Sequence, residues 1–192
     1  MLGDPAPNLT YKVDLPGGQS RLREAAIYVM RKCESAASFG LTKLNKTLWR
    51  ADFEAYAQRR VPVTGRLYQR LAQGPAPVEM PIVLQDLLRD GLVAIESRQV
   101  YQFTEKRPIA KVEPSMRYFS PDDLKYLDEA IRFYWDRSGR GASKQSHGVA
   151  WETRADGEPM PYNLAILSDA KLTPEQGRRF AAIGAERGWR SH

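Results

Sequence analysis

Residues 42–59 carry a long amphipathic pattern, and the helix that it predicts constrains the fold strongly. Leucine and alanine recur at helical spacing on one stripe, which places them on a single face of an α-helix. Pro62 and Gly65 follow this segment and are expected to end the helix. Aromatic side chains broaden the apolar face, so that the whole set comprises Leu41, Leu44, Leu48, Ala51, Ala55, Trp49, Phe53 and Tyr56.

Two further helices are predicted before and after this segment. Ser20 is expected to cap a helix over 21–37, whose apolar stripe places Cys33 in the core. Pro81 fits the first turn of a helix over 80–90, because proline lacks only an N–H that has no partner there. The side chains of this helix expected to face the core are Leu84, Leu87 and Leu88.

A fourth helix has the clearest start signal in the chain. Residues 120–123 read Ser-Pro-Asp-Asp, in which serine caps, proline takes the first position and the carboxylates favour the positive helix end. We expect this helix to reach Arg137, followed by a flexible loop at 138–143 and short helical pieces over 142–168. A capping-box pattern predicts a last helix over 174–187.

Two short alternating runs predict a β-hairpin over 92–103, with its turn near 97–99 and a basic connector over 106–117. Residues 66–78 predict a rigid loop after a short strand at 67–71, because two X-Pro steps impose extended backbone. A helix followed by a hairpin resembles the second half of a winged helix. We therefore predict a mainly helical α+β single domain with a small β-hairpin and a winged-helix-like unit embedded in it.

The composition fits one folded domain in the cytoplasm. The 192 residues are 42% hydrophobic, which supplies an ordinary core and excludes a largely disordered chain. The single cysteine, Cys33, excludes an internal disulfide and a cysteine-based zinc site. No basic and apolar leader is visible at the start, and the longest apolar run, residues 25–30, is too short to span a bilayer. We expect no membrane partner.

Nothing in the sequence points to catalysis, so we predict a protein that is not an enzyme and holds no metal or cofactor. There are only two histidines, and His147 follows Ser146 directly, which does not make a nucleophile–base pair. Asp52 and Glu54 stand two apart on a helix and point to different sides. The glycine-rich stretch 137–143 lacks the strand and the Lys-Ser/Thr ending of a phosphate loop.

A basic excess leaves nucleic acid as a less favoured alternative partner. The chain has 29 Lys and Arg against 23 Asp and Glu, a net charge of +6. If the helix–hairpin unit read DNA, Arg89 and Arg98 would be the contacts. The exposed set on that helix also includes Asp86 and Asp90, which would repel phosphates. We therefore favour a structural winged-helix-like scaffold over a DNA-binding transcriptional regulator.

The order of several motifs resembles the Panacea domain, the SocA-like antitoxin family, over about residues 21–168. The family pattern is a Leu-x-Lys-Leu-x-Lys-Leu-Leu-Tyr-Phe-Ala-Asp helix, a Thr-Gly turn and a Gly-Pro-x-Pro loop. The chain then matches again at 119–131 and at Ser146–Trp151 with the turn after it. The first matching positions are Leu41, Lys43, Leu44, Lys46, Leu48, Trp49, Ala51, Asp52, Thr64, Gly65, Gly74, Pro75 and Pro77.

Two departures from the family pattern stand out. Thr47 and Trp49 replace an aliphatic residue and a tyrosine, a tolerable change on an apolar face. Gly148 and Val149 stand where acidic residues often follow the histidine, which puts any charge-dependent role of that segment in doubt.

The resemblance implies an antitoxin of bacterial or phage origin, which neutralises a protein toxin encoded by a neighbouring gene. Neutralisation would proceed by direct binding or by delivery of the toxin to a protease. We expect the Panacea-like domain at 20–168, an N-terminal arm or tail at 1–19 and a C-terminal helical extension at 169–192. Residues proposed for partner binding lie on a rigid surface loop, in the connector and in the Ser-His…Trp segment: Gln73, Gly74, Pro75, Pro77, Lys106, Arg107, His147 and Trp151. The alternative role of the loop is to brace the helix over 80–90 against the helix over 42–59.

Overall fold

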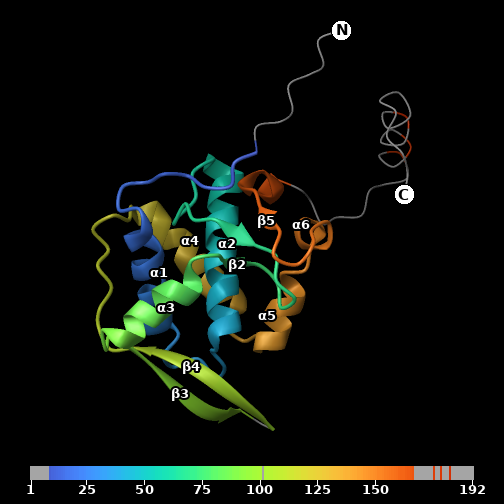
Figure 1. The fold of residues 1–192 in the computed structure, drawn as a ribbon. Helices are drawn as coiled ribbons and strands as arrows, with labels where there is room; N and C mark the ends of the chain where they lie inside the picture. Colours follow the sequence, from blue (N-terminus) through green and yellow to red (C-terminus); the bar gives the residue numbers. More distant parts are fainter. Residues whose placement is uncertain (1–8, 101, 167–174, 176–177, 179–181, 183–192) are drawn as a thin grey trace.

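The fold is built around one central helix. The computed structural model describes residues 9–100 and 102–166, together with positions 175, 178 and 182. The helix α2 (Leu41–Arg59) runs through the middle of the molecule, and other helices pack along its sides (Figure 1). The predicted helix over 42–59 is therefore confirmed. Its stripe is buried as expected, with no more than 1% exposure of Leu44, Leu48, Ala51 and Ala55.

The main core lies between α2 and three other helices. These are α1 (Gln19–Lys32), α3 (Met80–Arg89) and α4 (Pro121–Tyr134). Leu87 is fully buried on α3, and Leu84 packs against the core from a half-buried position. The expectation for Leu88 is wrong, because its side chain is 39% exposed and Val83 takes the inward position.

The start and end of α1 differ from the sequence-based expectation. Gly17 and Gly18 form a turn with positive φ, and α1 begins directly after it at Gln19, so Ser20 lies inside the helix and caps nothing. The helix ends at Lys32 instead of residue 37. Cys33 is buried as predicted. The backbone that follows is held by Arg107, whose guanidinium donates to the carbonyls of Glu34 and Ala36.

The hairpin is longer than predicted. β3 (Val93–Val100) pairs antiparallel with β4 (Phe103–Ala110), from Val93 opposite Ala110 to Val100 opposite Phe103. The turn expected at 97–99 is thus strand, and so is the first part of the connector expected over 106–117, up to Ala110. The hairpin projects from the body (Figure 1), so its outer part has no buried face to impose an alternating apolar pattern.

A second, smaller sheet lies on the other side of α2. Its strands are β1 (Tyr68–Gln69), β2 (Ala76–Pro77) and β5 (Pro159–Met160), in the antiparallel order β2-β1-β5. A strand is therefore present where one was expected at 67–71, but it covers only Tyr68–Gln69. The sheet and the 3-10 helix η1 (Tyr162–Ile166) enclose a cluster of aromatic residues and methionine: Phe53, Tyr56, Tyr68, Met160 and Tyr162.

Residues 120–166 are mostly helical. Ser120 and Asp123 form the capping box of α4, which confirms the predicted start. The flexible loop expected at 138–143 is instead part of α5 (Gly139–Gln145), because the Ser138 side chain caps it by accepting from the Gly141 N–H. The helix α6 (Val149–Glu152) follows. The helix predicted over 174–187 lies almost wholly outside the described residues.

This arrangement confirms the predicted mainly helical α+β fold, including the order helix α3 then hairpin. Within the described part of the chain, no helix is long and apolar enough to cross a membrane. That same part contains no group of three or more His, Cys, Asp or Glu side chains placed to hold a metal ion.

Candidate functional site

Asp52 anchors the sheet side of α2. Its carboxylate is fully buried and accepts hydrogen bonds from the Thr64 N–H at 2.5 Å, the Thr64 hydroxyl and the Tyr68 hydroxyl at 2.8 Å. Burial raises the pKa of this carboxyl above its ordinary value, against the opposing effect of these donors. Asp52 therefore ties the turn after α2 and strand β1 to the helix, and Glu54 lies apart from it, paired with Arg50.

Lys46 lies one helical turn and a half earlier and holds the loop at 71–75. Lys46 is 2% exposed, and its side-chain nitrogen donates to the Pro75 carbonyl at 2.7 Å. Gly74 adopts φ +97°, and a Cβ there would lie 2.3 Å from the Ser146 hydroxyl and 2.7 Å from Lys46 Cε. Only glycine fits this conformation and this gap. The loop is thus fixed between α2 and α5.

His147 and Trp151 meet this loop from the opposite side. Their rings stack with centroids 3.7 Å apart and planes 7° from parallel. The Trp151 indole N–H donates to the Leu71 carbonyl at 2.8 Å. The Ser143 hydroxyl donates to the Gln73 carbonyl at 2.9 Å and lies 3.3 Å from His147 Nε2. We call this set the loop–helix surface: Leu71, Gln73, Ser143, His147 and Trp151.

The electrostatics of this surface favour a neutral imidazole. Burial lowers the pKa of His147, and the positive charges of Lys46 and Arg70 lower it further. The Arg70 guanidinium lies 3.9 Å from the centroid of the Trp151 ring, a cation–π contact. Among the described residues no carboxylate is hydrogen-bonded to His147, so the Ser143–His147 pair lacks the orienting acid of a nucleophilic triad.

The structure brings together two groups of predicted site residues that are about 70 positions apart in the sequence. Gln73 and the His147–Trp151 stack share the loop–helix surface. The expected exposure of the rest of the loop is wrong, because Gly74, Pro75 and Pro77 are buried beneath it. They brace the loop against α2 and α5 and leave Leu71 and Gln73 exposed.

The two connector residues that were predicted to bind a partner, Lys106 and Arg107, have different environments. Lys106 is exposed on β4, opposite Ser97 on the hairpin. Arg107 is only 2% exposed, and its guanidinium donates to the carbonyls of Glu34 and Ala36 at 3.1 and 2.8 Å. Arg107 therefore holds the segment after α1 and is unavailable to a partner in this conformation.

The two residues expected to contact DNA under the alternative function, Arg89 and Arg98, lie on α3 and β3. Arg89 is exposed on α3 but pairs with Asp86 at 2.8 Å and with Asp90 at 3.1 Å. Arg98 is exposed on β3, opposite Glu105. The Asp86 and Asp90 carboxylates offset the positive charge of Arg89 that a DNA-reading helix would need, whereas the Glu105 carboxylate is paired with Arg107.

A family model described as antitoxin SocA-like, Panacea domain, matches residues 44–152, more than half of the chain. The chain belongs to the SocA-like antitoxin family. No curated protein matches the chain significantly, and no solved structure does. The matched range contains Lys46, Asp52 and the whole loop–helix surface. Membership of this antitoxin family supports a role in toxin neutralisation, with a toxin as the general class of partner.

Sequence reasoning missed several residues that shape the site of this SocA-like chain. Ser143 and Arg70 were not singled out, and Lys46 was only a motif position. The spacing of Ser143, His147 and Trp151, four residues at each step, was the one available signal. The contacts to the loop have no such signal, because they join residues 29, 70 and 80 positions apart.

Proposed function

We propose that this chain neutralises a protein toxin by direct contact, and that the loop–helix surface is the contact site. The toxin would be the product of a neighbouring gene, and the encounter would take place in the cytoplasm of a bacterium. Direct contact is the first step whether the toxin is then held inactive or passed to a protease. The proposal makes the chain a binding protein and not an enzyme.

The observation that carries the proposal is the rigidity of an exposed, partly aromatic surface. Lys46 and Gly74 fix the loop from below, while Trp151 and Ser143 hold its carbonyls from the side. A surface that is already ordered loses little conformational entropy when a partner binds. Leu71 is 39% exposed at the edge of this surface and supplies an apolar contact next to the Trp151 indole ring. Tryptophan is a residue type enriched at binding hot spots.

A growth assay with a matched pair of variants tests the proposal. The neighbouring gene is expressed alone, with the wild-type chain, with Leu71→Asp and with Ile82→Asp. Both side chains are exposed and apolar, but Ile82 lies on α3, away from the loop–helix surface. We expect the neighbouring gene to arrest growth, and the wild type and Ile82→Asp to restore it. Leu71→Asp should fail because it places a charge in an apolar contact.

Two outcomes would contradict this proposal at different levels. If the wild-type chain does not restore growth, the antitoxin function itself is wrong. If Leu71→Asp restores growth as well as the wild type, the function stands and the contact surface is elsewhere. Co-purification of the two proteins, with each variant shown to be folded by circular dichroism, then tells whether contact is direct.

A further inference from the structure

We infer that the outer edge of strand β3 pairs with β3 of a second copy of this chain, so that two hairpins form one four-stranded antiparallel sheet. This interface uses no residue of the loop–helix surface and goes beyond the proposed function. β3 pairs with β4 on one side only, in a sheet of two strands. In Figure 1 it lies on the outer side of the hairpin, with no other element beyond it. Such an edge presents N–H and C=O groups to a partner strand.

The alternation of the ladder identifies the backbone groups that point outward. The Lys111 N–H donates to the Leu92 carbonyl at 2.8 Å, one step beyond the paired strands, so even-numbered residues of β3 direct their backbone groups toward β4. Ile95 and Ser97 therefore direct their N–H and C=O groups to the free edge. Within the described part of the chain, no backbone hydrogen bond joins these two residues to another element. The register with β4 has no bulge, so the free edge is continuous.

The opposite edge of the hairpin, along β4, is covered. A Cβ at Gly40 would lie 3.4 Å from the Lys106 carbonyl oxygen, which places the start of α2 against the outer side of β4. The Ser38 hydroxyl, from the same segment, donates to the Glu105 carboxylate at 2.7 Å. Pro108 has no N–H to offer a partner. β3 is therefore the edge that remains for pairing.

The charges on β3 complement a second copy of the same strand. Glu96 and Arg98 are both exposed, and neither side chain forms an ion pair or a hydrogen bond with another described residue. Their neighbours across the hairpin, Arg107 and Glu105, pair with each other at 3.1 Å. In an antiparallel pair of β3 strands centred on Ser97, each Glu96 stands opposite the Arg98 of the other copy. The pairing thus gives both side chains a partner, twice over.

The same register also satisfies the backbone. Ser97 would lie at the two-fold axis and exchange N–H···O=C hydrogen bonds with Ser97 of the other copy, because its backbone groups point outward. Glu96 and Arg98 then occupy the adjacent non-hydrogen-bonded pairs, in which side chains approach most closely. Moving the centre by two residues, to Ile95, keeps the backbone bonds but loses both ion pairs. The charges therefore select one register.

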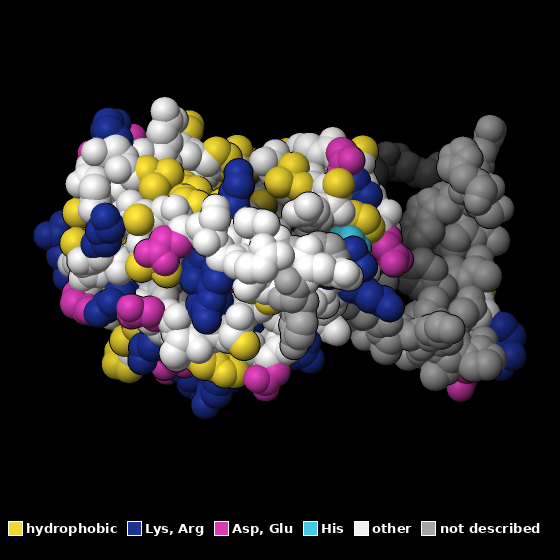
Figure 2. All heavy atoms as spheres, turned by 90° about the horizontal axis from the view of Figure 1, so that it is seen from below, with side chains coloured by type: hydrophobic (Ala, Val, Ile, Leu, Met, Phe, Trp, Pro, Cys, Tyr) yellow, Lys and Arg dark blue, Asp and Glu magenta, His cyan; other side chains and the backbone are white. Residues whose placement is uncertain are grey.

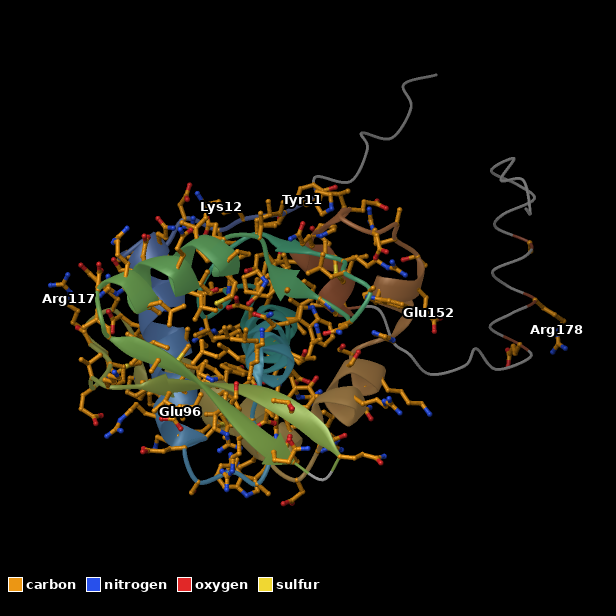
Figure 3. The ribbon with its side chains drawn as sticks, turned by 60° about the horizontal axis from the view of Figure 1, so that its bottom comes forward. Tyr11, Lys12, Glu96, Arg117, Glu152 and Arg178 are labelled. Atoms are coloured by element: carbon orange, nitrogen blue, oxygen red, sulfur yellow. The ribbon has the colours of Figure 1, made fainter. Side chains whose placement is uncertain are left out.

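The surface around the hairpin agrees with a partner of mixed charge. Figure 2 views the molecule from the hairpin end and shows Lys and Arg side chains interspersed with Asp and Glu side chains. Glu96 stands at the surface of the hairpin in Figure 3. A face of mixed sign suits a second copy of itself, whereas nucleic acid needs a track of cations along its phosphates.

The test measures the mass of the purified full-length chain by sedimentation equilibrium over a concentration series. It uses no toxin, so its outcome is separate from that of the growth assay. We expect the wild type to be a dimer that dissociates on dilution. Glu96→Arg and Arg98→Glu should each raise the dimer dissociation constant by about tenfold or more, because two attractive cross-strand pairs become repulsive. The control Lys106→Glu reverses an exposed charge on β4, two strand widths or about 10 Å from the second copy, and should change the constant by no more than about threefold.

Charge exchange separates a lost interface from a damaged hairpin. Each single reversal places like charges across the hairpin of its own chain, opposite Arg107 or Glu105. A mixture of Glu96→Arg with Arg98→Glu should nevertheless form a mixed dimer with about wild-type affinity, since each copy supplies the charges that the other lacks. The combined variant Glu96→Arg/Arg98→Glu should dimerise for the same reason. A dimer lost through damage to the hairpin would not return on mixing.

Ser97→Pro tests the backbone part of the interface. It removes an N–H that points to the free edge and leaves the ladder to β4 intact, so this variant should be monomeric where the wild type is dimeric. A wild type that stays monomeric up to about 1 mM would overturn the inference. A dimer that all of these variants retain would also overturn it, because the interface would then lie elsewhere. If the wild type is monomeric alone and Ser97→Pro loses binding to the product of the neighbouring gene, the edge serves the toxin and the inference is wrong.

Discussion

Lys46 carries an amine into the protein interior at the point where the 71–75 loop crosses α2. Its nitrogen donates to the Pro75 carbonyl, and its side chain fills the space next to Gly74. Burial lowers the pKa of Lys46 to about 7, from an ordinary value of 10.5. Both protonation states can donate to a carbonyl, so the loop contact persists across neutral pH.

This pKa gives the stability of the protein a pH dependence that can be assigned to one residue. Between pH 7 and 10.5 the unfolded chain binds a proton at Lys46 more often than the folded one, so the free energy of unfolding rises with pH in this range. In Lys46→Met that contribution is absent. In urea unfolding we expect the free energy of unfolding of the wild type to rise with pH relative to that of Lys46→Met, by at most about 1.4 kcal/mol per pH unit. Parallel pH curves for the two proteins would contradict the prediction.

Asp123 joins three helices at the start of α4. It accepts from the backbone of Ser120 in the capping box, from Arg21 of α1 at 2.9 Å, and from Arg59 at the end of α2. Burial acts to raise the pKa of this carboxyl, but the hydrogen bonds from Arg59, Ser120 and Arg21 outweigh it, so the pKa is lowered. The charged form therefore stabilises the folded protein above the ordinary pKa of an aspartate.

Removing this charge should loosen the packing of the elements. Asp123→Asn leaves Arg21, which is 4% exposed, without its carboxylate, and we expect a loss of about 3–5 kcal/mol at pH 7. Asp122→Asn, at the exposed neighbouring position, should cost no more than about 1 kcal/mol. Denaturant unfolding measures both variants. As pH falls below about 4, Asp123 takes up a proton in the unfolded chain before it does so in the folded protein, so the difference from the wild type should shrink. A difference that is constant from pH 7 to 3 would show that charge is not the cause.

At the scale of elements, the sequence predicted what local chemistry determines. α2 follows from its apolar stripe, and α4 from a serine cap with a proline and two aspartates. The 138–143 segment was misread because two glycines suggest a loop, whereas the Ser138 cap and packing against α2 make it helical. The hairpin turn was misplaced because the strands extend into solvent, where burial no longer imposes an alternating pattern.

Only part of the candidate site could be predicted from the sequence, because contacts between distant segments decide which residues meet. Gln73 was proposed from its place on the rigid loop, and His147 and Trp151 belong to a motif of the family resemblance, but the proximity of the three residues depends on tertiary contacts. Arg107 looked like a surface cation because sequence does not record that its guanidinium turns inward to two carbonyls. Residue type gave the chemistry, and only the packing of distant segments decided which groups face a partner.

At the scale of the whole molecule, much of the basic excess is structural. Among the described residues five cationic side chains are buried, against two buried carboxylates. The cations hold carbonyls or carboxylates inside the fold: Arg21, Lys43, Lys46, Arg66 and Arg107. The net charge of +6 thus overstates the positive charge available at the surface. This weakens the case for nucleic acid and favours a localised contact with a protein.

Variants of the helix–hairpin unit, α3 with β3 and β4, give the sharpest test of whether the partner is nucleic acid or protein. Arg89→Glu and Arg98→Glu combined reverse two exposed charges on α3 and β3, at positions outside the loop–helix surface. We expect this double variant to restore growth against the neighbouring gene as well as the wild type, because the proposed toxin contact is the loop–helix surface. Binding to a mixed-sequence DNA duplex should be weak for both proteins at 150 mM salt, about physiological ionic strength.

The opposite result would assign the function to the other face of the molecule. A regulator that reads DNA through α3 and the hairpin would bind duplex with an affinity that falls steeply and linearly on a log–log plot against salt. The double variant would lose that binding, since it replaces two phosphate-attracting charges with two that repel. Loss of growth restoration by a folded double variant would move the toxin contact to this face. Retained growth restoration together with retained weak DNA binding leaves the helix–hairpin unit as scaffold, packed on the core through Leu87 and Val93.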